Sequence, residues 1–169
     1  VRGTVNILRR KYPNIKISYA SYSYEYDKKK LADCDVNIIN RDRKKWTFRN
    51  VLRKIFSIFN IRIYQPFDNL NFVINNKFDT VFSIGGDMYT LGHDNRYNKS
   101  LPLFFESCIK HGINYVLWGA SVGAFNKNPK AETFYINHLK KAKLIVAREN
   151  ETIDYLRTIG ISENVIFAP

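Results

Sequence analysis

The chain has 169 residues, 45% of them hydrophobic, which is enough apolar material for one domain with a substantial core. No run approaches 18 consecutive apolar residues, so the sequence encodes no transmembrane helix. Cys34 and Cys108 are far apart and form no CxxC pair, so we expect two reduced thiols, with Cys108 on a buried helix face, in a cytoplasmic protein.

The formal net charge of +12 is concentrated near the N-terminus, where residues 1–54 hold 15 Lys and Arg against 5 Asp and Glu. A solvated basic face explains this bias, and so does contact with an anionic membrane or a phosphorylated glycan carrier. Nucleic acid is disfavoured as a partner, because the basic runs Lys28–Lys30 and Arg41–Lys45 match no recognition motif.

Apolar spacing predicts the elements of the first part of the chain. An amphipathic helix opens it and ends at Pro13, since Val1, Val5 and Leu8 recur at helical spacing. The elements expected after it are a strand over Ile15–Ser23, a short helix-then-strand segment over Leu31–Asn40, and helices over Trp46–Phe59 and Phe67–Asn76.

From residue 80 onward, strands and helices alternate. The strands expected are Thr80–Ile84, Asn114–Trp118, Leu144–Ala147 and Val165–Phe167. The helices between them are Ser100–His111, one that begins at Asn128-Pro129, and Asn150–Ile159. This β-α-β-α-β-α-β order predicts an α/β fold with a Rossmann-like parallel sheet.

Three loops follow predicted strands and should meet at the carboxyl edge of that sheet: Gly85-Gly86-Asp87, Gly119–Gly123 and Arg148-Glu149. The glycine turns offer backbone N–H donors, and Ser121 offers a hydroxyl. Arg148 has a planar fork suited to a carboxylate or phosphate, whereas Asp87 is an acceptor for a sugar hydroxyl or a base for one. Equally, the glycines could be tight turns and Asp87 a cap.

Other site chemistries have less support. The loops lack the GxGxxG order of a dinucleotide fingerprint, and no Walker sequence occurs. The three histidines have no metal-ligand spacing with carboxylates or cysteines, so no metal or cofactor is expected. His93 lies near the first loop and could face the crevice, His111 ends a helix, and His138 reads as a core histidine.

Four segments, in order, resemble the polysaccharide pyruvyl transferase family: SIGGDMYTLG, WGASVGAF, HLKKAKLIVARENETIDYLRTIGI and NVIFAP. The similarity covers most of the chain and is weakest over Asp27–Asn76. The family's GGD motif falls on Gly85, Gly86 and Asp87, and its glycine loop includes Ser121 and Gly123. The arginine of its A-R-E motif falls on Arg148, with Glu149 beside it.

The resemblance implies a glycosyltransferase-B-like enzyme with two Rossmann-like halves. Such enzymes transfer the enolpyruvyl unit of phosphoenolpyruvate to hydroxyls of a surface polysaccharide or exopolysaccharide, forming a pyruvate ketal. The acceptor saccharide could be lipid-linked, with peripheral membrane contact through the basic N-terminal third. Residues 1–169 would be the N-terminal domain, truncated at both ends, with the C-terminal domain and its general acid absent and the isolated chain inactive.

Two other functions are compatible with the same sequence. One is a nucleotide-sugar-dependent glycosyltransferase of the same overall shape, whose donor would lie in the second domain. The other is a non-catalytic module that binds a glycan or a membrane through its basic face.

Overall fold

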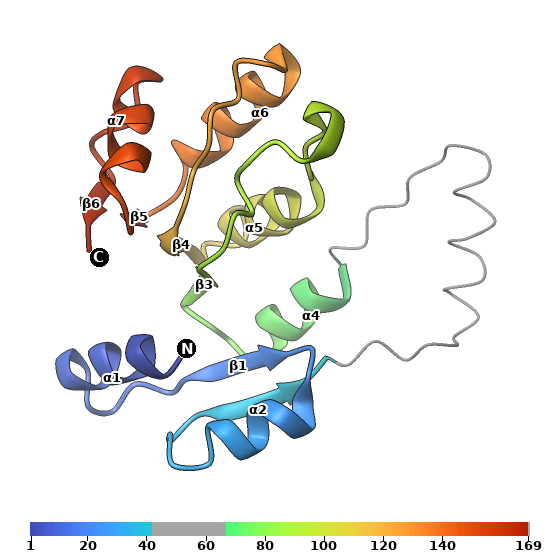
Figure 1. Ribbon diagram of the computed structural model, residues 1–169. Helices are drawn as coiled ribbons and strands as arrows, with labels where there is room; N and C mark the ends of the chain where they lie inside the picture. Colours follow the sequence, from blue (N-terminus) through green and yellow to red (C-terminus); the bar gives the residue numbers. More distant parts are fainter. Residues whose placement is uncertain (42–66, 169) are drawn as a thin grey trace. The chain divides into compact units, whose positions relative to one another are not determined.

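The computed structural model describes residues 1–41 and 67–168, and the chain divides into two compact units, Val1–Ile63 and Tyr64–Pro169 (Figure 1). The helix predicted over Trp46–Phe59 lies outside the described residues. None of the helices within the described ranges is long and apolar enough to cross a bilayer.

The first unit contains a short parallel pair of strands. Its elements are α1 (Arg2–Lys11), β1 (Ser18–Ser21), α2 (Tyr24–Lys30) and β2 (Asn37–Asn40). Strands β1 and β2 pair in parallel, with Ser18 opposite Asn37 and Ser21 opposite Asn40. The opening helix is confirmed, and β1 is shorter than the strand predicted over Ile15–Ser23.

Helix α2 corrects the prediction for the segment that follows. The helix lies before Leu31, which is its C-cap, and only the strand β2 falls within Leu31–Asn40. None of the residues of α2 is buried, so the apolar spacing on which the prediction relied is absent. Its charges are nevertheless those of a helix, with acidic residues in the first turn and Lys28–Lys30 in the last.

The second unit is built on a four-stranded sheet (Figure 1). Its strands are β3 (Thr80–Ile84), β4 (Asn114–Ala120), β5 (Leu144–Ala147) and β6 (Val165–Phe167), which are parallel and adjacent in that order. The other elements are α4 (Phe67–Asn75), the 3₁₀ turn η1 (His93–Asn95), α5 (Ser100–Lys110), α6 (Pro129–Leu139) and α7 (Asn150–Thr158). This alternation confirms the predicted α/β class with a Rossmann-like parallel sheet.

Local chemistry explains where α6 begins. The Asn128 side chain accepts a hydrogen bond from the N–H of Ala131 at 3.1 Å, and Pro129 occupies the first helical position. Proline at that position has no N–H that would be left without a partner, so cap and proline together fix the start of the helix.

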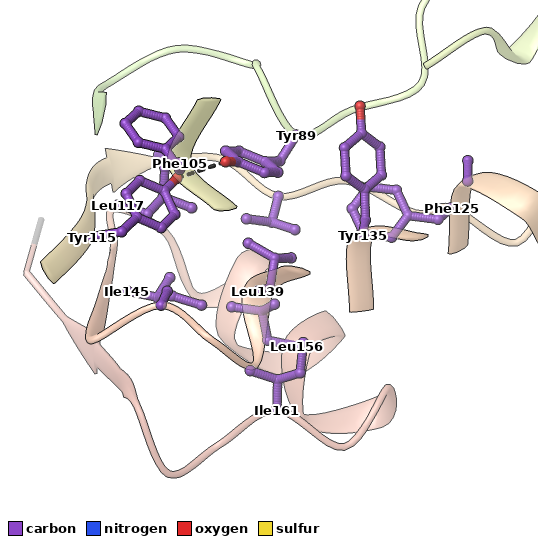
Figure 2. Close-up of a cluster of buried hydrophobic side chains, with 14 residues drawn as sticks. Tyr89, Phe105, Tyr115, Leu117, Phe125, Tyr135, Leu139, Ile145, Leu156 and Ile161 are labelled. Atoms are coloured by element: carbon purple, nitrogen blue, oxygen red, sulfur yellow. Dashed lines mark hydrogen bonds between the residues drawn. The ribbon is translucent and has the colours of Figure 1, made fainter. Parts of the chain in front are cut away.

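One face of the sheet forms the main core with helices α5, α6 and α7 (Figure 2). Tyr115 and Leu117 point to this face from β4, and Ile145 lies opposite Leu117 on β5. The helices add Phe105, Tyr135, Leu139 and Leu156. A smaller cluster joins α4 to α5 through Leu70, Val73, Cys108 and Ile113.

Cys108 is buried and free, as predicted. Burial raises the pKa of its thiol to about 11, so the thiol stays protonated at neutral pH. Because the thiolate is the reactive form of cysteine, Cys108 contributes packing and no nucleophile.

The buried face of the sheet predicts a matched pair of stability changes. Ile145 is 0% exposed and Ile166, on the neighbouring strand, is 49% exposed. We expect Ile145→Ala to lower the free energy of unfolding by about 2–5 kcal/mol, because it leaves a cavity, and Ile166→Ala to lower it by less than about 1 kcal/mol. Urea unfolding of both variants measures the difference, and equal losses would contradict this description of the core.

Candidate functional site

Asp87 is placed by a two-glycine turn at the carboxyl end of β3. Gly85 and Gly86 have φ angles of +64° and +83°, which residues with a Cβ rarely adopt. The N–H of Gly85 donates to the carbonyl of Trp118 on β4 at 2.7 Å. The turn is therefore joined to the neighbouring strand and leads the chain out to an exposed Asp87.

Arg148 follows β5 and extends toward the Asp87 loop. Its Nη2 lies 3.3 Å from Asp87 Oδ1, and its Nε lies 3.7 Å from Glu149 Oε2. The side chains of Arg148 and Asp87 are 46% and 69% exposed. Exposed ion pairs of this kind stabilise a fold by about 1 kcal/mol or less, so an incoming anion can compete with Asp87 for the guanidinium.

The loop after β4 packs tightly against the Asp87 loop. Tyr89 and Val122 form a parallel β-bridge, and the N–H of Gly123 donates to the Tyr89 carbonyl at 3.0 Å. A Cβ at position 123 would lie 3.1 Å from Cγ2 of Thr90, closer than ordinary van der Waals contact. Glycine at 123 thus permits the close approach of the two loops.

Thr152, on the first turn of α7, connects the second loop to the third. Its Oγ1 accepts a hydrogen bond from the N–H of Val122 at 3.1 Å and donates one to Glu149 Oε1 at 3.1 Å. Tyr155 adds a further link, because its hydroxyl accepts the N–H of Phe125 at 2.7 Å. Backbone hydrogen bonds between the first two loops, and hydrogen bonds of the Thr152 and Tyr155 side chains, therefore brace the three loops.

Glu149 is held in its ionised form. The Ser121 hydroxyl is the main cause of its lowered pKa, followed by the hydrogen bond from Thr152 and the positive charge of Arg148, while partial desolvation acts in the opposite direction. Ser121 Oγ itself is buried and makes no hydrogen bond of ordinary geometry.

The structure brings the predicted site residues to one sheet edge, where Arg148 contacts both Asp87 and Glu149. The amides of Gly85 and Gly123 donate within the fold, so ligand donors must come from other groups, foremost Arg148. Sequence reasoning missed Thr152 and Tyr155. Their three-residue spacing on α7 is the only sequence pattern that could have pointed to them.

In the part of the chain that the structure describes, each histidine bonds to groups other than Asp87, Arg148 and Glu149. His93 pairs with Asp94 at 3.0 Å on the exposed turn η1, and His111 is the C-cap of α5. His138 is buried, as predicted for a core histidine. Among the residues that the structure describes, no three His, Cys, Asp or Glu side chains gather in a way that could hold a metal ion.

A shallow pocket of about 310 Å³ lies away from Asp87 and Arg148. Its lining includes Asn114 at the amino end of β4 and Lys143 directly before β5. In parallel α/β sheets ligands bind outside the carboxyl ends of the strands, so the pocket lies at the edge opposite the candidate site. The charged residues at the carboxyl edge, and not this pocket, are therefore the candidate functional site.

The whole chain matches a known protein family. The family model described as Polysaccharide pyruvyl transferase matches residues 1–169, the whole chain. Comparisons with curated proteins and with solved structures found no significant match.

The position of Ser121 predicts a pH effect on Glu149. Because the hydroxyl stabilises the carboxylate, Ser121→Ala should raise the pKa of Glu149 toward the ordinary value of a glutamate. A carbon-13 NMR titration of the Glu149 carboxyl measures this shift. Ser107→Ala is the control, because its hydroxyl bonds the Leu103 carbonyl within α5. An unchanged titration in Ser121→Ala would show that Thr152 and Arg148 alone hold the charge.

Proposed function

The chain belongs to the polysaccharide pyruvyl transferase family. We propose that it binds the donor in an enzyme that transfers enolpyruvyl from phosphoenolpyruvate to a saccharide. The proposed product is a pyruvate ketal on a surface polysaccharide or exopolysaccharide. The family match supports the general transferase function, and the chemistry of the Asp87–Arg148 pair supports this choice of donor.

The observation that carries the proposal is the exposed guanidinium of Arg148, held at the sheet edge by an acidic partner 3.3 Å away. Phosphoenolpyruvate bears a carboxylate and a phosphate, both of which match the planar fork of arginine. When the donor binds, one of these groups replaces Asp87 on Arg148. The freed Asp87 carboxylate then accepts a hydrogen bond from a sugar hydroxyl or takes its proton.

The proposed formation of the ketal conserves atoms and electrons. A proton adds to the CH₂ carbon of the enol, which becomes a methyl group, and two sugar oxygens form bonds to the central carbon. The bond from that carbon to the phosphate oxygen breaks, and inorganic phosphate leaves with the remaining hydroxyl proton. Arg148 stabilises the negative charge of the donor and of the departing phosphate. The acid that protonates the enol carbon would come from a second α/β domain, in a glycosyltransferase-B-like arrangement.

The proposed partners are phosphoenolpyruvate and a saccharide acceptor, which could be lipid-linked. The basic N-terminal part of the chain suits an anionic membrane surface, since Lys28–Lys30 lie on α2 beside Tyr26, which is exposed. The proposed location is therefore the cytoplasmic face of a membrane, with peripheral contact, where a lipid-linked acceptor would also be found.

A donor assay tests the proposed function. The enzyme, expressed as its complete open reading frame, should release phosphate from phosphoenolpyruvate only when a saccharide acceptor is present. The product should contain acid-labile pyruvate. Arg148→Lys should lower kcat/KM for phosphoenolpyruvate roughly 10- to 100-fold, because a lysine cannot form two parallel hydrogen bonds to a carboxylate or phosphate.

Arg157→Lys is the matched control. Arg157 lies on α7 and pairs with Asp154 at 3.1 Å, away from Asp87 and Glu149, so this variant should keep its activity. Release of a nucleotide from a nucleotide sugar, with no consumption of phosphoenolpyruvate, would identify a glycosyltransferase instead. Equal activity of the two lysine variants would remove Arg148 from the donor site.

A further inference from the structure

A network of polar side chains runs from the surface into the core beneath the loop that carries Asp87, and three of its members, Tyr89, Tyr115 and His138, are buried. The Tyr89 hydroxyl lies 2.6 Å from the Tyr115 hydroxyl and 2.9 Å from His138 Nε2. On its other side, His138 Nδ1 lies 3.0 Å from Glu106 Oε1, and Lys141 Nζ donates to Glu106 Oε2 at 2.7 Å. Figure 2 shows the bond between the two tyrosine hydroxyls inside the core.

The charges assign a direction to these hydrogen bonds. Burial disfavours the ionised form of Glu106, but its hydrogen bonds from Lys141 and His138 outweigh burial and keep its pKa below the usual value. A carboxylate only accepts, so the proton of His138 is on Nδ1 and Nε2 accepts from the Tyr89 hydroxyl. Burial also lowers the pKa of His138, which keeps the ring neutral at pH 7.

Tyr89 is the point at which this network reaches the candidate site. Its side chain is 0% exposed, and its ring stacks on that of His138 with a centroid distance of 5.6 Å. Two residues earlier is Asp87, whose carbonyl accepts a hydrogen bond from the Thr90 hydroxyl at 2.7 Å. A fixed Tyr89 therefore limits how far the exposed Asp87 can move.

We propose that Tyr89 and His138 are positioning residues: their hydrogen-bonded, stacked pair anchors residues 85–92 so that Asp87 stays beside Arg148. Neither side chain contacts the ion pair, and both act through the loop backbone. The proposal rests on the proposed function only for the identity of the ligand, because the anchoring itself is a property of this fold.

Tyr89→Phe tests the anchor by removing one hydroxyl. Tyr135→Phe is the matched control, because Tyr135 is equally buried in the same cluster and its hydroxyl bonds the backbone of Asn98 instead (Figure 2). Amide hydrogen exchange of residues 85–92 is the first readout. We expect protection in Tyr89→Phe to fall roughly tenfold below that in Tyr135→Phe, as the loss of the two hydrogen bonds of the Tyr89 hydroxyl allows.

Phosphoenolpyruvate binding, measured by calorimetry, is the second readout. The Kd should fall by up to about fivefold in Tyr89→Phe and stay unchanged in Tyr135→Phe, because only the first variant loosens Asp87, which competes with the donor for Arg148. Long-range nitrogen NMR of His138 should show the Nδ1–H tautomer at pH 7 in the unaltered protein. Should Tyr89→Phe not fold, His138→Gln provides the same comparison, because it removes the stacked ring and changes the acceptor for Tyr89.

The outcomes separate this proposal from the proposed function. Equal exchange of residues 85–92 in the two phenylalanine variants overturns the positioning role, as does an Nε2–H tautomer of His138. Faster exchange in Tyr89→Phe alone supports it, even if phosphoenolpyruvate does not bind, in which case the proposed donor is wrong. Donor binding that is equally tight in all variants overturns the positioning role and leaves the donor in place.

Discussion

The parallel pairing of β3, β4 and β5 is the constraint on which the candidate site depends. Parallel strands end at the same edge of a sheet, so the loops that follow them converge although they are distant in the chain. Asp87 and Arg148 are 61 residues apart in sequence and 3.3 Å apart in space. Without this register, the acidic turn and the arginine would be unrelated features of the surface.

In the candidate site, hydrogen bonds within the fold hold the backbone of the loops, whereas the charged side chains on those loops are exposed to solvent. Backbone N–H groups of the first two loops are used inside the fold, where Trp118, Tyr89 and Thr152 accept them. Buried amides require such partners, so these bonds resist displacement. Arg148 and Asp87 face solvent, where an ion pair is weak and can be exchanged for a ligand. An anion can therefore bind without rearranging the loops.

The buried network extends this bracing into the aromatic core. Polar atoms are costly in such a core unless each has a partner, and the hydroxyl of Tyr89 has two. The proton arrangement is fixed by Glu106, because its carboxylate determines which nitrogen of His138 is protonated. The Glu106 carboxylate on α5 is thus linked to the Asp87 loop by the hydrogen bonds of His138 and Tyr89 and by the stacking of their rings.

The sequence by itself determined the order of elements in the second unit and the edge at which its polar loops meet. Apolar alternation and caps such as Asn128-Pro129 are local, so they can be read without tertiary information. Helix α2 was missed because its two aromatic residues, Tyr24 and Tyr26, are not at helical spacing and none of its residues is buried. Only the tertiary structure decided which groups join the loops, including Thr152 and the Tyr89–His138 pair, because such partners depend on how strands and helices pack across long separations in the chain.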